Sequence, residues 1–172
     1  MGFFDKLKER TEGVLTSAKP DDGVAAVSEA ELRDRLLAIT GKGLTTRTDD
    51  DGDVVVAWAA KVASVGAGAA YEYRYRAIRL SLDEGDHEAA ATCFKTDTEA
   101  ELDFDASFSL SRSWERGQHI GSETMHVVAW LGPHHTSGGA DEKGYKFSWG
   151  ALRQQVMDTV TGAGWTYKPR KV

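Results

Sequence analysis

Cysteine, proline and long apolar runs are scarce in this sequence, and each scarcity excludes a class of protein. Of 172 residues, one is cysteine and three are proline. Cys93 has no second cysteine with which to close an intramolecular disulfide, so the fold depends on its core. No apolar run approaches the roughly 20 residues of a membrane-spanning helix, and the first residues lack the apolar stretch of a signal peptide. We therefore expect a cytoplasmic protein without a transmembrane segment.

Basic residues are also in short supply. The chain carries 21 Lys and Arg against 27 Asp and Glu, a net charge of −6. A protein that binds nucleic acid through general electrostatics needs a basic surface for phosphate contacts. We therefore expect no nucleic-acid partner.

Two helices are predicted from apolar spacing. The first, over 28–40, opens with a capping box formed by Ser28 and Glu31 and has Leu32, Leu36 and Ile39 on one side. The second, over 148–162, repeats apolar residues at helical spacing from Trp149 to Val160 and ends near Gly162 and Gly164.

Between these helices the period changes from 3.6 to 2, which is typical of strands joined by turns. We predict a hairpin turn over 48–53, where aspartates and glycine cluster, and a further short strand over 145–147. The alternating segment runs from Leu44 to Leu131, and the strands predicted within it cover 53–62, 70–82, 87–97, 102–114 and 124–131.

The strand over 70–82 changes phase along its length. Tyr71, Tyr73 and Tyr75 occupy odd positions, whereas Ile78 and Leu80 occupy even ones. Such a change either inserts one residue as a β-bulge or moves the apolar face to the other side of the sheet. We favour a bulge near Ala77.

These elements predict an α+β fold in which a curved antiparallel meander of five to seven strands packs against an N-terminal helix, 28–40, and a C-terminal helix, 148–162. At the level of architecture this resembles a helix-grip ligand-binding domain. We divide the chain into an N-terminal amphipathic helix with a linker, residues 1–23, and a single α+β domain, residues 24–172.

Aromatic side chains suggest where a ligand would bind. Tyr71, Tyr73 and Tyr75 form a stripe along one strand, and Trp149 opens the last helix. A cleft between a curved sheet and a helix is a common ligand site. We expect these four residues to line such a cleft and to bind a small apolar ligand.

An acidic row suggests a second kind of surface. Glu99, Glu101, Asp103 and Asp105 are all odd-numbered, so a continuous strand would place them on one face. Carboxylates so close repel one another, and a basic protein partner would relieve the repulsion. Phe3 and Phe4, on the N-terminal helix, could dock on a partner or a membrane surface. The nearly neutral charge of this helix favours a protein partner over peripheral membrane contact.

Histidines near the polar loop over 132–144 offer the best chance of catalysis. His126, His134 and His135 could act as acid or base there. Their spacing matches no zinc-binding pattern, so we expect neither a metal nor a cofactor.

The sequence thus favours a non-enzymatic binding or protein-interaction module over an enzyme. The ligand would occupy the cleft between sheet and helix, or a protein partner would bind the acidic face. The alternatives are a small enzyme centred on the loop histidines and a subunit of a larger assembly that docks through its N-terminal helix.

Overall fold

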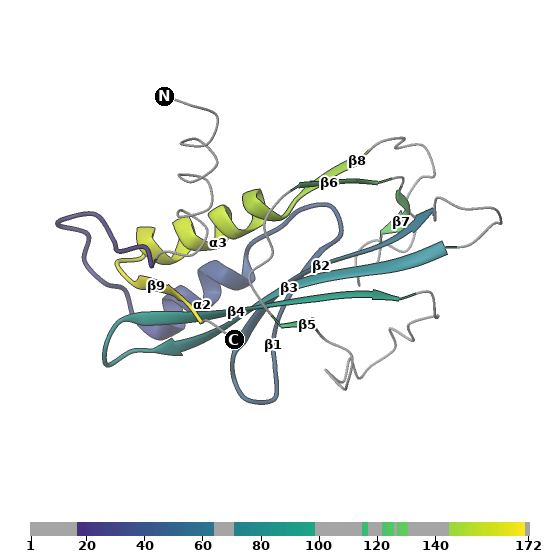
Figure 1. Cartoon of the computed structure of the whole chain (residues 1–172). Coiled ribbons are helices and arrows are strands. Elements are labelled where there is room, and N and C mark those ends of the chain that lie inside the picture. The colour runs from purple at the N-terminus through teal and green to yellow at the C-terminus, as the bar shows by residue number, and fades with distance from the viewer. Residues whose placement is uncertain are drawn as a thin grey trace, which may run out of the picture.

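The computed structural model is α+β, with both described helices on one face of an open sheet (Figure 1). It describes residues 17–63, 71–98, 115–116, 122–125, 127–130 and 145–170. The predicted fold class is therefore confirmed. The predicted strand over 102–114 and the loop over 132–144 lie outside the described residues.

The centre of the fold is an antiparallel meander of four strands that follow one another in sequence. These strands are β1 (Leu44–Thr48), β2 (Val54–Ala63), β3 (Tyr71–Asp83) and β4 (Glu88–Thr98). Three short strands extend this sheet: β5 (Glu115–Arg116) and β9 (Thr166–Pro169) pair with β4, and β7 (Val127–Trp130) pairs with β2.

The sheet is mixed rather than purely antiparallel, because β9 runs parallel to β4. The sequence did not predict β9, which is only four residues long and too short to show a period. The predicted strand over 124–131 is in fact two strands. Its first part, β6 (Ser122–Met125), pairs with β8 (Tyr145–Ser148) in a separate two-stranded sheet, while β7 joins the main sheet.

The predicted bulge near Ala77 is wrong. Pairing between β2 and β3 is continuous from Val54 opposite Leu80 to Ala63 opposite Tyr71, with no shift of register. The phase change in the sequence has another cause, which is that both faces of the sheet are buried in this region. Every residue from Val54 to Ala60 is buried, so β2 alternates between two apolar environments rather than between core and solvent.

We call these environments the inner and outer clusters. The inner cluster lies under the helices and includes Val54, Val56, Trp58, Ala60, Ile78 and Leu80 together with the buried apolar residues of both helices. The outer cluster lies on the opposite face and consists of Val55, Ala57, Ala59, Tyr75, Ala77 and Phe94.

Helix α2 (Glu29–Leu37) begins where the capping box predicts. The Ser28 hydroxyl oxygen accepts a hydrogen bond from the Glu31 backbone N–H at 3.3 Å. Leu32 and Leu36 are fully buried in the inner cluster, which confirms the predicted core side of this helix. The helix ends at Leu37, three residues before its predicted end.

Helix α3 (Trp149–Gly162) is capped in the same way. The Ser148 hydroxyl oxygen accepts from the Ala151 backbone N–H at 3.1 Å. Trp149, Leu152, Val156 and Val160 are buried at the predicted spacing.

The chain from Ser17 to Ser28, part of which the sequence predicts to be a linker, is hydrogen-bonded to the C-terminal part of the domain. Ala18 and Tyr167 exchange two backbone hydrogen bonds of 3.0 and 2.8 Å. The Trp165 indole N–H donates to the Val27 carbonyl at 2.8 Å. These contacts join the N-terminal segment to the strand that follows α3.

Gly164 allows this junction to form. Its φ is +78°, and a Cβ at this position would lie 2.5 Å from the Ala25 carbonyl oxygen. Backbone therefore packs directly on backbone, a close approach that only glycine permits.

We expect Gly164→Ala to lower the free energy of unfolding by at least about 2 kcal/mol, because it adds left-handed strain to a clash with rigid backbone. Gly162→Ala is the matched control, since a Cβ there meets nothing within 4 Å and φ is not positive. This control should be neutral or stabilising by up to about 1 kcal/mol. Urea denaturation of both variants measures the difference, and equal midpoints would contradict the packing described.

Candidate functional site

A pocket of about 250 Å³ opens at one end of the interface between sheet and helices. We call it the helix-side pocket. Three segments far apart in sequence form it: the connection between α2 and β1, strand β2, and the start of α3 with the end of β8. Its lining residues are Thr40, Gly41, Lys42, Leu44, Trp58, Phe147, Ser148, Ala151, Leu152 and Gln155.

Aromatic rings form one wall of the helix-side pocket. The rings of Trp58 and Phe147 stack with centroids 4.1 Å apart and planes 16° from parallel. Trp149 lies behind Phe147, at a centroid distance of 6.3 Å. Register fixes this arrangement, because Trp58 lies on the inner side of β2 opposite Leu44 of β1.

The rim of the helix-side pocket is polar. Thr40 and Lys42 come from the α2–β1 connection, and Ser148 and Gln155 come from the start and middle of α3. A site with an apolar wall and a few polar groups at its mouth suits a small ligand that is flat and mostly apolar.

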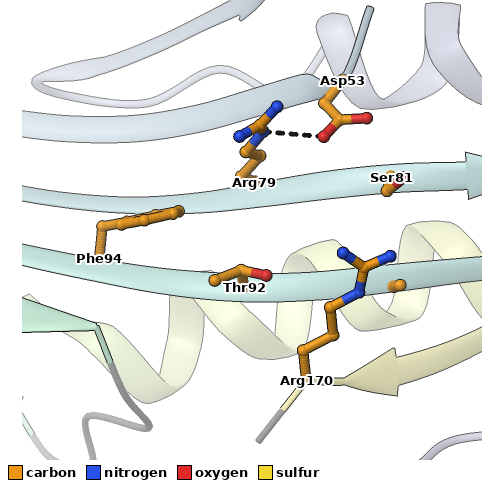
Figure 2. Close-up of a pocket in the computed structure, with 7 residues that line it drawn as sticks. Asp53, Arg79, Ser81, Thr92, Phe94 and Arg170 are labelled. Carbon is orange, nitrogen blue, oxygen red and sulfur yellow. Dashed lines mark ion pairs between the residues drawn. The ribbon is translucent and has the colours of Figure 1, made fainter. Parts of the chain in front are cut away.

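Another pocket, of about 210 Å³, lies on the opposite face of the sheet. We call it the outer-face pocket; Figure 2 shows its lining residues on neighbouring strands. Its chemistry differs from that of the helix-side pocket, because most of the lining side chains are polar or charged. They are Asp53, Arg79, Ser81, Ala90, Thr92, Phe94 and Arg170.

An aspartate cluster holds Arg79 at the edge of the outer-face pocket. The Arg79 Nε lies 2.9 Å from a carboxylate oxygen of Asp49 and 2.8 Å from one of Asp53, and its Nη2 lies 2.6 Å from Asp51. These interactions outweigh partial desolvation and raise the pKa of the guanidinium. Asp49 also closes the predicted hairpin turn, since its other oxygen accepts from the backbone N–H of Asp51 and of Asp53.

The structure separates the residues that the sequence assigns to one cleft. Tyr75 belongs to the outer cluster, whereas Trp149 is buried in the inner cluster, so the sheet lies between them. Burial raises the pKa of Tyr75 to about 12, against the opposing attraction and hydrogen bond of Arg47. Only the backbone of Tyr71 and Tyr73 is described, opposite Ala63 and Lys61 of β2.

The remaining predicted site residues lie outside the described residues, and their roles stay predictions. They are Phe3, Phe4, Glu99, Glu101, Asp103, Asp105, His126, His134 and His135. Within the described ranges, no group of three or more His, Cys, Asp or Glu side chains is arranged to hold a metal ion. Neither described helix combines the length and apolar character needed to cross a bilayer.

Sequence reasoning missed Trp58, Phe147 and Arg170 as pocket residues. Trp58 and Phe147 look like ordinary core positions of alternating strands, and only the tertiary fold brings their rings together. Arg170 follows β9, so its place on the outer face depends on the parallel pairing of β9 with β4. No local sequence pattern predicts this pairing.

Comparison of the chain with protein-family models, with curated proteins and with solved structures finds no match. The interpretation of both pockets therefore rests on their own chemistry.

Cys93 is a core thiol. Only 4% of the residue is exposed, and burial raises its pKa to about 11, against the opposing attraction of the Arg153 guanidinium. A raised thiol pKa keeps the sulfur neutral and poorly nucleophilic.

We expect the native thiol to react at least about 100-fold more slowly with a disulfide reagent at pH 8 than the thiol of the guanidinium-unfolded chain. Stability should also depend on pH in a defined window. The neutral thiol contributes fully below the unfolded-state pKa of about 8.5, and this contribution is lost as pH rises towards the folded value of about 11. Between pH 8 and 11 the free energy of unfolding should fall less in Cys93→Ala than in the unmodified protein. Identical pH profiles of the two proteins would refute this expectation.

Proposed function

We propose that this protein is a binding module that holds a small, flat, mostly apolar ligand in the helix-side pocket. The observation that carries the proposal is the pair of stacked rings, Trp58 and Phe147, in the wall of a pocket that opens between the α2–β1 connection and α3.

The size of the helix-side pocket supports a ligand of one or two rings. Sites for drug-sized molecules occupy roughly 300–1,000 Å³, and the helix-side pocket, at about 250 Å³, is just below that range. Trp58 and Phe147 are 1% and 4% exposed and already stack on each other, so an apolar ligand would contact only the small part of each ring that faces the pocket.

The position of the pocket supports binding without disruption of the fold. Most of the space between the sheet and the helices is filled by the inner cluster, so the ligand site is confined to the end where α3 begins. The lining residues Gly41, Lys42, Ala151 and Gln155 are exposed, so a ligand can enter between the α2–β1 connection and α3.

Two neighbouring glutamines of α3 provide a matched test. Gln154 and Gln155 are both exposed, but only Gln155 lines the helix-side pocket. Gln155→Phe should fill the pocket and weaken binding of indole by about 10-fold or more, because loss of even 1.4 kcal/mol of contact energy corresponds to a factor of ten. Gln154→Phe, which adds the same ring one position away, should bind indole as the unmodified protein does.

The measurement is a titration with indole followed by backbone amide NMR shifts. We expect saturable shifts at Gly41, Lys42 and Ala151. Cyclohexanol serves as a non-planar control and should bind more weakly. Equal loss of binding in both glutamine variants, or indole shifts confined to residues far from this pocket, would refute the proposal.

A further inference from the structure

Charges of opposite sign face each other across the outer-face pocket. Asp53 stands just before β2 and Arg170 just after β9, with β3 and β4 between them. Three strand spacings of about 4.8 Å separate their backbones by about 14 Å. The long Arg170 side chain covers part of this distance, and its guanidinium lies over β4 (Figure 2).

Arg170 is anchored by its backbone rather than by its charge. Its backbone N–H donates to the Ala91 carbonyl at 2.8 Å. The residue is exposed, and no carboxylate of the described part of the chain forms an ion pair with its guanidinium. The planar guanidinium group of Arg170 offers N–H donors to a carboxylate in the pocket.

The opposite end of the pocket lies beside a cluster with an excess of negative charge, of which Asp53 and Arg79 line the pocket. Three carboxylates, those of Asp49, Asp51 and Asp53, share the single guanidinium of Arg79. Asp53 uses one oxygen for that ion pair, and its second oxygen has no hydrogen-bond partner in the described ranges. That oxygen is therefore able to accept from an ammonium group.

Hydroxyl groups lie between the two charged ends. Ser81 on β3 and Thr92 on β4 are half-buried and lie diagonally across the strand pair, and Phe94 lines the same pocket. A simple anion would be attracted by Arg170 but repelled by the aspartates. A simple cation would be attracted by the aspartates but repelled by Arg170. Only a ligand that carries both charges is attracted at both ends.

We propose that the outer-face pocket binds a small zwitterion, a molecule of amino-acid size with one carboxylate and one ammonium group. The carboxylate contacts Arg170 and the Ser81 and Thr92 hydroxyls, and the ammonium group contacts Asp53. The volume of about 210 Å³ restricts the ligand to a single short chain. This site is independent of the helix-side pocket, since the two lie on opposite faces of the sheet.

The test uses linear probes that differ in the separation of their charged ends or lack one of the two charges. Glycine, 4-aminobutyrate and 6-aminohexanoate vary the separation of the charges, while butyrate and butylamine remove one charge each from 4-aminobutyrate. We expect one zwitterion of the series to shift the backbone amides of Thr92 and Arg170 saturably. Its Kd should be at least about 10-fold below those of the singly charged analogues, because each charged contact typically contributes more than a factor of ten.

Two variants assign the ends of the ligand, and one controls for net charge. Arg170→Gln should weaken binding of the zwitterion and of butyrate by about 10-fold and leave binding of butylamine unchanged. Asp53→Asn should weaken binding of the zwitterion and of butylamine and leave binding of butyrate unchanged. Lys168→Gln removes a positive charge from β9 outside the pocket, where Lys168 pairs with Glu88, and should change none of them.

Butyrate that binds as tightly as the best zwitterion would show an ordinary anion site and overturn the proposal. Failure of the whole series to shift Thr92 and Arg170, or equal effects of Arg170→Gln and Lys168→Gln, would overturn it as well. Arg170 is exposed, so its substitution leaves the core intact, and thermal denaturation of each variant verifies that it is folded.

Discussion

The unbroken pairing of β2 with β3 is the constraint on which the rest of the molecule depends. Ten consecutive pairs without a shift fix the faces of the described side chains that take part in this pairing. A slip by one residue would move Trp58 to the outer face and Val55 and Ala57 under the helices. Because Trp58 is a wall of the helix-side pocket and Arg79 an edge of the outer-face pocket, one register determines both sites.

The parallel pairing of β9 with β4 adds the second long-range condition. It places the segment after α3 beside residues some eighty positions earlier, with Glu88 opposite Thr166. This pairing brings Arg170 to the outer face, while Trp165 and Gly164 hold the segment before α2. Strand pairs so distant in sequence have a large loop-closure cost, which the buried Trp165 and Tyr167 help to offset.

The sequence predicts the features that depend on neighbouring residues, such as helix caps and turns. The capping box at Ser28, the apolar spacing of α3 and the aspartate turn before β2 all appear where the sequence indicated them, because each depends on residues within a few positions. The phase change in β3 was misread, since alternation reports which side of a strand is apolar but not whether both sides are covered. The pockets could not be predicted, because Trp58 stacks on Phe147, and Thr92 and Arg170 line one pocket, only after the strands have paired.

The two pockets also differ in how the charge of the whole protein acts on them. With a net charge of −6, the summed charge of the protein disfavours the approach of an anion, an effect that salt at about 0.1 M screens beyond about 10 Å. A mostly apolar ligand at the helix-side pocket carries little charge and is hardly affected. A zwitterion at the outer-face pocket has no net charge either, so the overall field neither attracts nor repels it, and only the local separation of Asp53 and Arg170 orients it. An acidic protein can therefore use an arginine for a carboxylate without attracting other anions, provided that carboxylates such as those around Arg79 stand at the far end of the same pocket.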